Sequence, residues 1–193
     1  MRILKFVTAL VLVGASAFAQ EATEETPAET TEPALADQFP VGGVPEQPQE
    51  VVRAMHGDWE IRCAGESDNC FMYQLLLDSN GNPVAEFSLI KLPIGSEAVA
   101  GATVVAPLGT LLTRGLTMRI DEGEATTYPF SWCTRPGCFA RFGLTDLLVS
   151  NMQSGTDLNL VVFSIAQAQA PIEVKASLAG FTAAFEELPN QAN

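Results

Sequence analysis

The sequence has 193 residues, with 10 basic side chains against 23 acidic ones and a net charge of −13 at pH 7. Nucleic acid and anionic lipid both reward clustered Lys and Arg, so this balance argues against either as a partner. Solubility of an exported protein is the simplest meaning of such acidity.

The N-terminus has the three parts of a secretory signal peptide. Residues 1–5 are basic, residues 6–13 are apolar but too short to cross a bilayer, and Ala17-Phe18-Ala19 matches a cleavage site. The predicted signal peptide is therefore residues 1–19, and the mature chain begins at Gln20. No later stretch is long and apolar enough for a transmembrane segment, so we expect an exported, soluble protein.

Residues 20–52 are rich in Glu, Thr and Pro, with eight acids and no Lys or Arg. Such a segment buries too little apolar surface to offset its ordering entropy, which predicts a disordered acidic linker. It could serve as a stalk or as a plain spacer. The remaining residues, 53–193, are enough for one folded domain with a sizeable core.

In the first half of this domain, alternating polar and apolar residues predict three antiparallel strands, at 58–63, 70–77 and 84–91. Asn80-Gly81 marks a tight turn between the second and third. Its spacing of Asp78, Asn80 and Asn82 faintly resembles a calcium loop, but the glycine falls at the fourth position rather than the sixth. We expect a hairpin turn here, and residues 93–107, which are small and Gly-containing, to be looser.

The second half of the domain also alternates between polar and apolar residues, and it adds two short helices. Helical spacing predicts one helix through Leu144, Leu147, Leu148 and Met152 that ends at Gly155, and a last helix at 181–188 closed by Pro189. Strands are predicted at 116–120, 127–132, 138–142, 157–163 and 172–178. Many short strands with two helices indicate a mainly β fold, an antiparallel β-sandwich.

A tight turn lies between two apolar runs at residues 130–140. Pro136 and Gly137 suit the two central positions of a type II turn, in which the glycine takes a positive φ. The turn brings Cys133 close to Cys138. Trp132 and the neighbouring phenylalanines are then available to pack beneath it.

The four cysteines follow the signal peptide and are locally spaced, which favours two disulfides. Four cysteines allow three connectivities, and the predicted hairpins favour Cys63 with Cys70 and Cys133 with Cys138. A Cys₄ zinc site is an alternative, although the gap between Cys63 and Cys70 does not suit it. A redox-active pair is another, although no C-x-x-C is present.

Other candidates for chemistry are isolated. His56 is the single histidine, and no nucleophile is identifiable near it. Ser88 and Lys91 match S-x-x-K, but the companion motifs are missing and the two would point to opposite faces of a strand. Glu186 and Glu187 are adjacent on a helix and do not face each other. We therefore predict no catalytic residues, no metal and no cofactor.

Three residues are candidates for contact with a partner. Trp59 and Trp132 could form an aromatic recognition surface, although each lies near a cysteine and could equally pack against a disulfide in the core. Arg135 lies at the tip of the predicted turn and could contact an anionic partner.

An ordered set of short motifs resembles the invasion-associated locus B family of exported bacterial proteins. The motifs cover nearly all of residues 53–190: Gly57-Asp58-Trp59 with Cys63, the strand from Cys70, Pro107-Leu108-Gly109, residues 116–121, Phe130 with Cys133, Gly137-Cys138-Phe139-Ala140, and Ser177-Leu178-Ala179-Gly180-Phe181. The resemblance implies an immunoglobulin-like β-sandwich in the periplasm or outer envelope of a Gram-negative bacterium. It supplies no catalytic residues.

The sequence thus leaves three hypotheses. The first is a non-enzymatic envelope protein, a disulfide-pinned β-sandwich that binds a protein or cell-wall partner. The second is a surface-exposed factor that contributes to host-cell contact or invasion, with the linker as its stalk. The third is a small periplasmic hydrolase or redox protein, which the single histidine and the lack of an activated nucleophile disfavour.

Overall fold

The structure, a computed structural model, describes residues 49–191. The predicted signal peptide and most of the predicted linker lie outside these residues. The first strand already begins at Glu50, which places the start of ordered structure slightly before the predicted boundary at residue 53.

Eleven strands and two α-helices make up the described chain, with a short 3₁₀ turn, η2 (Leu112–Arg114). The elements are β1 (Glu50–His56), β2 (Trp59–Ala64), β3 (Cys70–Leu77), β4 (Pro83–Lys91), β5 (Ala100–Ala106), β6 (Leu116–Ile120), β7 (Thr126–Tyr128), β8 (Phe130–Thr134), β9 (Gly137–Leu144), α1 (Asp146–Ser154), β10 (Asp157–Ser164), β11 (Gln167–Ser177) and α2 (Phe181–Glu187). The prediction of a mainly β, antiparallel fold with two short helices is confirmed.

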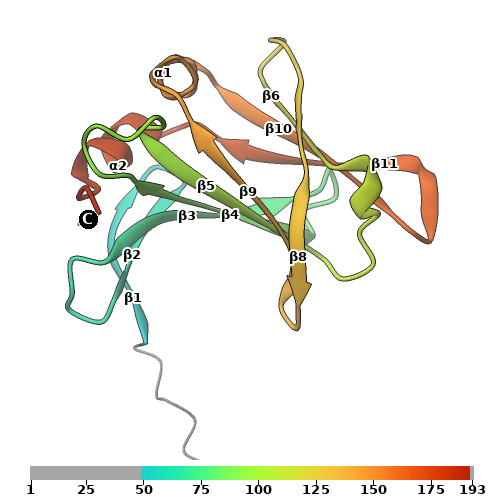
Figure 1. Cartoon of the computed structure of the whole chain (residues 1–193), viewed down its shortest axis with the longest axis horizontal. Helices are drawn as coiled ribbons and strands as arrows, with labels where there is room; N and C mark the ends of the chain where they lie inside the picture. Colours follow the sequence, from blue (N-terminus) through green and yellow to red (C-terminus); the bar gives the residue numbers. More distant parts are fainter. Residues whose placement is uncertain (1–48, 192–193) are drawn as a thin grey trace, which may run out of the picture. The chain divides into compact units, whose positions relative to one another are not determined.

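The strands form one hydrogen-bonded sheet, in the order β7-β6-β10-β11-β3-β4-β5-β9-β8, with β2 and β1 added alongside β3 (Figure 1). Its first and last strands are consecutive in the chain and are separated by Pro129 alone. Proline has no N–H for a ladder and so ends one pairing before the next begins. The sheet therefore bends round on itself and is nearly barrel-like. This shape is compatible with the two packed layers of a sandwich, but here both layers belong to one continuous hydrogen-bonded sheet.

Strict alternation of side chains builds the core inside this bend. Trp59 of β2, Phe87 of β4 and Phe181 of α2 are fully buried, and the indole of Trp59 meets both phenyl rings edge-on at 5.7 and 5.4 Å. Edge-to-face contacts of this kind add to the burial of apolar area. The core thus joins the sheet to the last helix.

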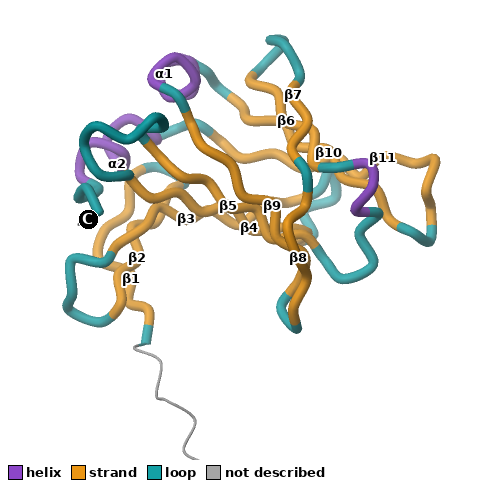
Figure 2. The backbone as a smooth tube through the Cα atoms, in the orientation of Figure 1, coloured by secondary structure: helices purple, strands orange, loops and turns teal. Residues whose placement is uncertain are grey.

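Both α-helices lie at the same end of the sheet (Figure 2). Thr145 caps α1, since its hydroxyl accepts a hydrogen bond from the backbone N–H of Leu148 at 3.3 Å. Gly155 ends α1 as predicted. The predicted apolar stripe is wrong in two places: Leu144 is the last residue of β9 rather than part of the helix, and Leu147 is 71% exposed. Met152 is buried as expected, together with Val149.

Two further predictions are corrected. The segment expected to be loose contains β5, which pairs with β4 on one side and β9 on the other; its inward residues are mostly alanines, whose weak strand preference concealed it. Gly137 has no positive φ, so the turn is not type II. A Cβ at Gly137 would overlap the carbonyl of Ala106, so close approach to β5 explains this glycine.

Candidate functional site

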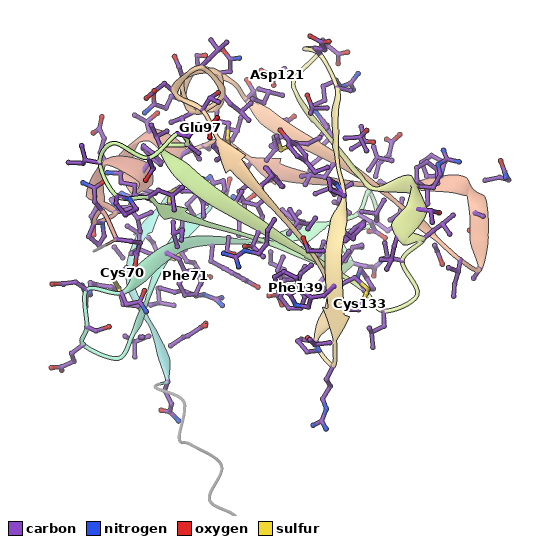
Figure 3. All side chains as sticks on the ribbon, viewed as in Figure 1. Cys70, Phe71, Glu97, Asp121, Cys133 and Phe139 are labelled. Atoms are coloured by element: carbon purple, nitrogen blue, oxygen red, sulfur yellow. A yellow bond between two sulfur atoms is a disulfide. The ribbon has the colours of Figure 1, made fainter. Side chains whose placement is uncertain are left out.

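A candidate binding surface lies on the outward side of the sheet, across β2, β3, β4, β5, β9 and β8. We call it the aromatic face, and its residues are Arg62, Phe71, Tyr73, Trp132, Phe139 and Arg141. Cross-strand pairing brings these side chains close to one another. Arg62 lies opposite Phe71, Arg141 lies opposite Thr103, and Trp132 lies opposite Phe139. Phe71 and Phe139 lie on the same side of the ribbon (Figure 3).

Trp132 is the most exposed ring of this face. It is 44% exposed and stacks on Phe139, with ring centroids 5.4 Å apart and ring planes 13° apart. The guanidinium of Arg141 lies 5.9 Å from the Trp132 ring centroid. Half-exposed tryptophan next to arginine is the composition found at the centres of protein interfaces.

At the opposite end of the face, a second arginine, Arg62, lies over an aromatic ring, that of Tyr73. The guanidinium carbon of Arg62 is 3.4 Å from the ring centroid of Tyr73, and its Nε donates to the Glu60 carboxylate at 2.6 Å. Burial opposes the charge on Arg62, but this hydrogen bond and the nearby carboxylates raise the pKa of Arg62 above its usual value. Burial also raises the pKa of Tyr73 above 10.0. At this end of the face, the Arg62 side chain is therefore held in place by Tyr73 and its charge is already paired with Glu60.

A shallow depression of about 240 Å³ separates the two ends. Phe71 and Arg141 are among its walls, and its floor includes Ser88, Gly101 and Thr103. The small floor residues leave room above the sheet for a side chain or another small group of a partner.

The predicted contact residues separate in the structure. Trp132 and Arg135 are exposed, Arg135 in the two-residue loop that joins β8 to β9, because Thr134 pairs with Gly137. Trp59 has no exposed surface and lies in the core, so it cannot contact a partner at this face. Arg141, which completes the exposed group, was not predicted. Its position two residues after Phe139 in the same strand was the available signal.

The same alternation would also have revealed Gln74, a polar residue in an otherwise buried run. Its side-chain amide donates to the carbonyls of Asp58 and Ser177 at 3.0 and 3.1 Å, and its carbonyl accepts from the Ser177 N–H at 2.7 Å. Trp59 also donates, through Nε1, to the Ser177 carbonyl at 2.9 Å. Gln74 therefore joins β2 and β11 where both reach the same edge of β3, a structural role.

All four cysteines are bonded in the local pairing. Cys63 is linked to Cys70 and Cys133 to Cys138, each pair directly opposite across its antiparallel ladder. No sulfur is therefore available as a thiolate for zinc. The first disulfide is buried, whereas Cys133 of the second is exposed.

The remaining candidates for chemistry have structural partners. His56 Nε2 lies 2.6 Å from a carboxylate oxygen of Glu187, which links the end of β1 to α2. Ser88 donates to the Thr103 carbonyl, and Lys91 donates to the Glu186 carbonyl, so they do not act together. Among residues 49–191, no cluster of three or more His, Cys, Asp and Glu side chains is placed to hold a metal.

A second hollow, of about 770 Å³, lies over another part of the outer surface. Its lining mixes five carboxylates with two cations, one of which, Lys175, pairs with Asp157 at 3.5 Å. Apolar side chains of β3 and β10 complete it, among them Leu75 and Val161. Its carboxylates outnumber its cations by three, so the hollow is acidic.

The described residues thus define an antiparallel β domain that is pinned by two hairpin disulfides and carries an exposed aromatic and arginine surface. A model of the invasion associated locus B (IalB) protein family matches residues 59–189, and the chain belongs to this family. Neither α-helix in the described part of the chain has the length and apolar character that crossing a membrane requires.

Curated relatives and a solved structure agree with this assignment. The chain is 28% identical over 134 residues to the invasion protein B homologs of Brucella abortus strain 2308 and of Brucella abortus biovar 1 strain 9-941, which covers 68% of this chain and 75% of each relative. It is also similar to the crystal structure of invasion associated protein B from Bartonella henselae. That match has a TM-score of 0.60 at 23% identity and covers 70% of this chain and 94% of the other, which shows a shared fold.

Proposed function

We propose that this member of the family is an exported, non-catalytic protein of the cell envelope that binds a protein or cell-wall partner through the aromatic face. The observation that carries the proposal is the exposed stack of Trp132 on Phe139 beside Arg141. Tryptophan and arginine are both enriched at the centres of protein interfaces, and here they lie together on the surface.

Export to the periplasm or outer envelope is supported by the signal peptide pattern and by the disulfides, which persist in oxidising compartments. The curated relatives come from Gram-negative bacteria. Mass spectrometry of the protein from an envelope fraction should find a mature N-terminus at Gln20. An intact Met1 in the cytoplasmic fraction would contradict export.

The absence of catalysis is supported by how the reactive side chains are used. Within residues 49–191, the histidine is held by Glu187 and every cysteine is in a disulfide. A hydrolase that works through a covalent nucleophile needs that group next to a base, and a thiol redox enzyme needs an accessible low-pKa thiol. The described residues offer neither.

Photo-crosslinking in cells tests the binding surface. A benzophenone amino acid replaces Trp132 in one strain and Leu147, which is 71% exposed on α1, in a control strain. We expect a discrete crosslinked species, to protein or to cell-wall polymer, from position 132 only. Equal products from both positions, or none from 132, would contradict the proposed surface.

A role in host-cell contact is the second candidate, and the names of the relatives favour it. It requires the protein to face outward. A Glu-specific protease added to intact cells should then cut the acidic segment at residues 21–50. Protection until the outer membrane is permeabilised would instead place the protein in the periplasm.

A further inference from the structure

We propose that the partner of the aromatic face is a protein that supplies an extended acidic segment, and that this segment adds as an antiparallel strand to the free edge of β8. The inference rests on the proposed function and names the chemistry of its partner. It follows from the pairing of β8, the charge of the β8–β9 hairpin and the rigidity of that hairpin.

β8 has an open edge. It is the last strand of the sheet and pairs with β9 alone. Among the described residues, its backbone makes no hydrogen bond outside that ladder. An exposed row of unpaired N–H and C=O groups is a template onto which an extended peptide can dock, with main-chain hydrogen bonds giving affinity.

The hairpin has a charge opposite to that of the domain. Phe130 to Leu144 contain Arg135 and Arg141 and no acid, whereas residues 49–191 together carry 16 acidic and 8 basic side chains. Neither arginine lies within 4.0 Å of a carboxylate of the described chain. By contrast, Arg62 is committed to Glu60 and Arg119 lies 3.7 Å from Glu122. Arginine binds carboxylates through two parallel hydrogen bonds, so these two free guanidinium groups favour Asp or Glu side chains.

The other exposed strand edges lack this combination. β7 pairs only with β6, is three residues long and closely follows Glu122 and Glu124. β1 pairs only with β2 and exposes Val51, Val52 and Met55, but it begins with Glu50, and its Arg53 is 3.5 Å from Asp68. An acidic segment would meet like charge there. The charges therefore direct such a segment to β8.

The site is also held in one shape. The disulfide between Cys133 and Cys138 closes the tip of the hairpin, and the Trp132 ring rests on Phe139. A surface that is already ordered loses little conformational entropy when it binds. Alternate side chains of an added strand face one way, so every second residue would lie on the same side as Trp132 and Arg141, and acidic residues at those positions could reach the arginines.

A random dodecapeptide library displayed on phage, selected on the immobilised chain from Gln20, tests the inference without requiring the natural partner. We expect selected peptides to carry Asp or Glu at alternating positions. A synthetic copy of the best peptide should lose about tenfold or more in affinity when N-methylation removes alternate backbone N–H groups, because several main-chain hydrogen bonds are lost. Arg135→Glu with Arg141→Glu should weaken binding by a similar factor, whereas the matched control Arg119→Glu on β6 should leave it within about twofold.

The possible results separate this inference from the proposed function. The inference of an acidic added strand would be wrong if the selected peptides carried no acidic residues. It would also be wrong if N-methylation of neither set of alternate positions changed the affinity of the peptide. A crosslink from position 132 to polysaccharide, with no peptide selected, would also overturn it while leaving the envelope-binding function in place. Absence of both crosslink and selected peptide would remove both proposals.

Discussion

At the scale of single residues, Gly57 and Gly180 explain why two motifs far apart in the sequence belong together. Both have positive φ, at 57° and 85°, and a Cβ on either would overlap the backbone of the other segment. Asp58 donates from its backbone to the carbonyl of Ala179 in the same contact, at 3.2 Å. Only glycine allows this close approach of β1 and β2 to the entrance of α2.

Substitution of Gly57 separates close approach from backbone preference. Gly65 has nearly the same φ, 58°, but a Cβ added there would have no neighbouring atom within 4 Å. We expect Gly65→Ala to lower the free energy of unfolding by about 1–2 kcal/mol, the usual left-handed penalty. Gly57→Ala should cost at least about 3 kcal/mol because the Ala179 carbonyl must also move. Urea unfolding measures both; equal losses would show that the contact is unimportant.

Gln74 gives a second test at this scale. Gln74→Ala removes three hydrogen bonds and leaves the Asp58 carbonyl and the Ser177 N–H without this partner in a largely buried place. The free energy of unfolding should fall by about 2–3 kcal/mol. Gln153→Ala, on the exposed side of α1, should change it by less than about 0.5 kcal/mol. A loss for Gln74→Ala as small as that of the control would contradict the role assigned to Gln74.

At the scale of elements, the two disulfides close similar hairpins but differ in access. Cys63 and Cys70 are 0% and 1% exposed, whereas Cys133 is exposed. Because thiol exchange depends on access to sulfur, dithiothreitol should reduce the pair of Cys133 and Cys138 first. Differential alkylation followed by mass spectrometry gives the order. Earlier reduction of the Cys63–Cys70 bond would contradict this prediction. By loop entropy, loss of either disulfide should lower the free energy of unfolding by about 2 kcal/mol.

The turn between β3 and β4 should make stability depend on pH. Hydrogen bonds from the side chain and backbone of Asn82, and from the backbone of Asn80, hold the pKa of Asp78 below its ordinary 3.8. The stabilisation is therefore present above about pH 4 and is lost as the pH falls through the lowered value. The difference in stability between wild type and Asp78→Ala should shrink in acid. A difference between wild type and Asp78→Ala that stayed constant as the pH fell would contradict this role of the Asp78 carboxylate.

The sequence predicted those elements whose residues alternate strongly or carry clear end signals, such as β2, β3, β4 and α2. It missed β5, because Ala and Gly give no contrast between the two faces, although neighbouring strands on both sides impose the pairing. Trp132 and Arg135 were proposed as contact residues from their positions near and in the turn. Their combination with Arg141 depends on the register of β8 against β9, which sequence spacing alone does not set.

At the scale of the whole described domain, Pro129 joins the two ends of the sheet. Tyr128 pairs with Leu116 and Phe130 pairs with Ala140, so one residue separates the first ladder from the last. Tyr128 also stacks on Phe142 of β9, with ring centroids 3.9 Å apart. The closure thus depends on a short edge segment rather than on the centre of the sheet.

Native-state hydrogen exchange should reveal this dependence. β4 and β5 have a neighbour on both sides, so their amides should exchange only through global unfolding, whereas β7 and β8 should open together at a lower free energy. Tyr128→Ala should lower that opening energy in both strands by a common amount, because it removes the stack that holds the segment against β9. Ser131→Ala, an exposed change in the same segment, should leave it unaltered. If β7 and β8 responded to Tyr128→Ala by different amounts, the two strands would open separately, and the closing segment would not be a single cooperative unit.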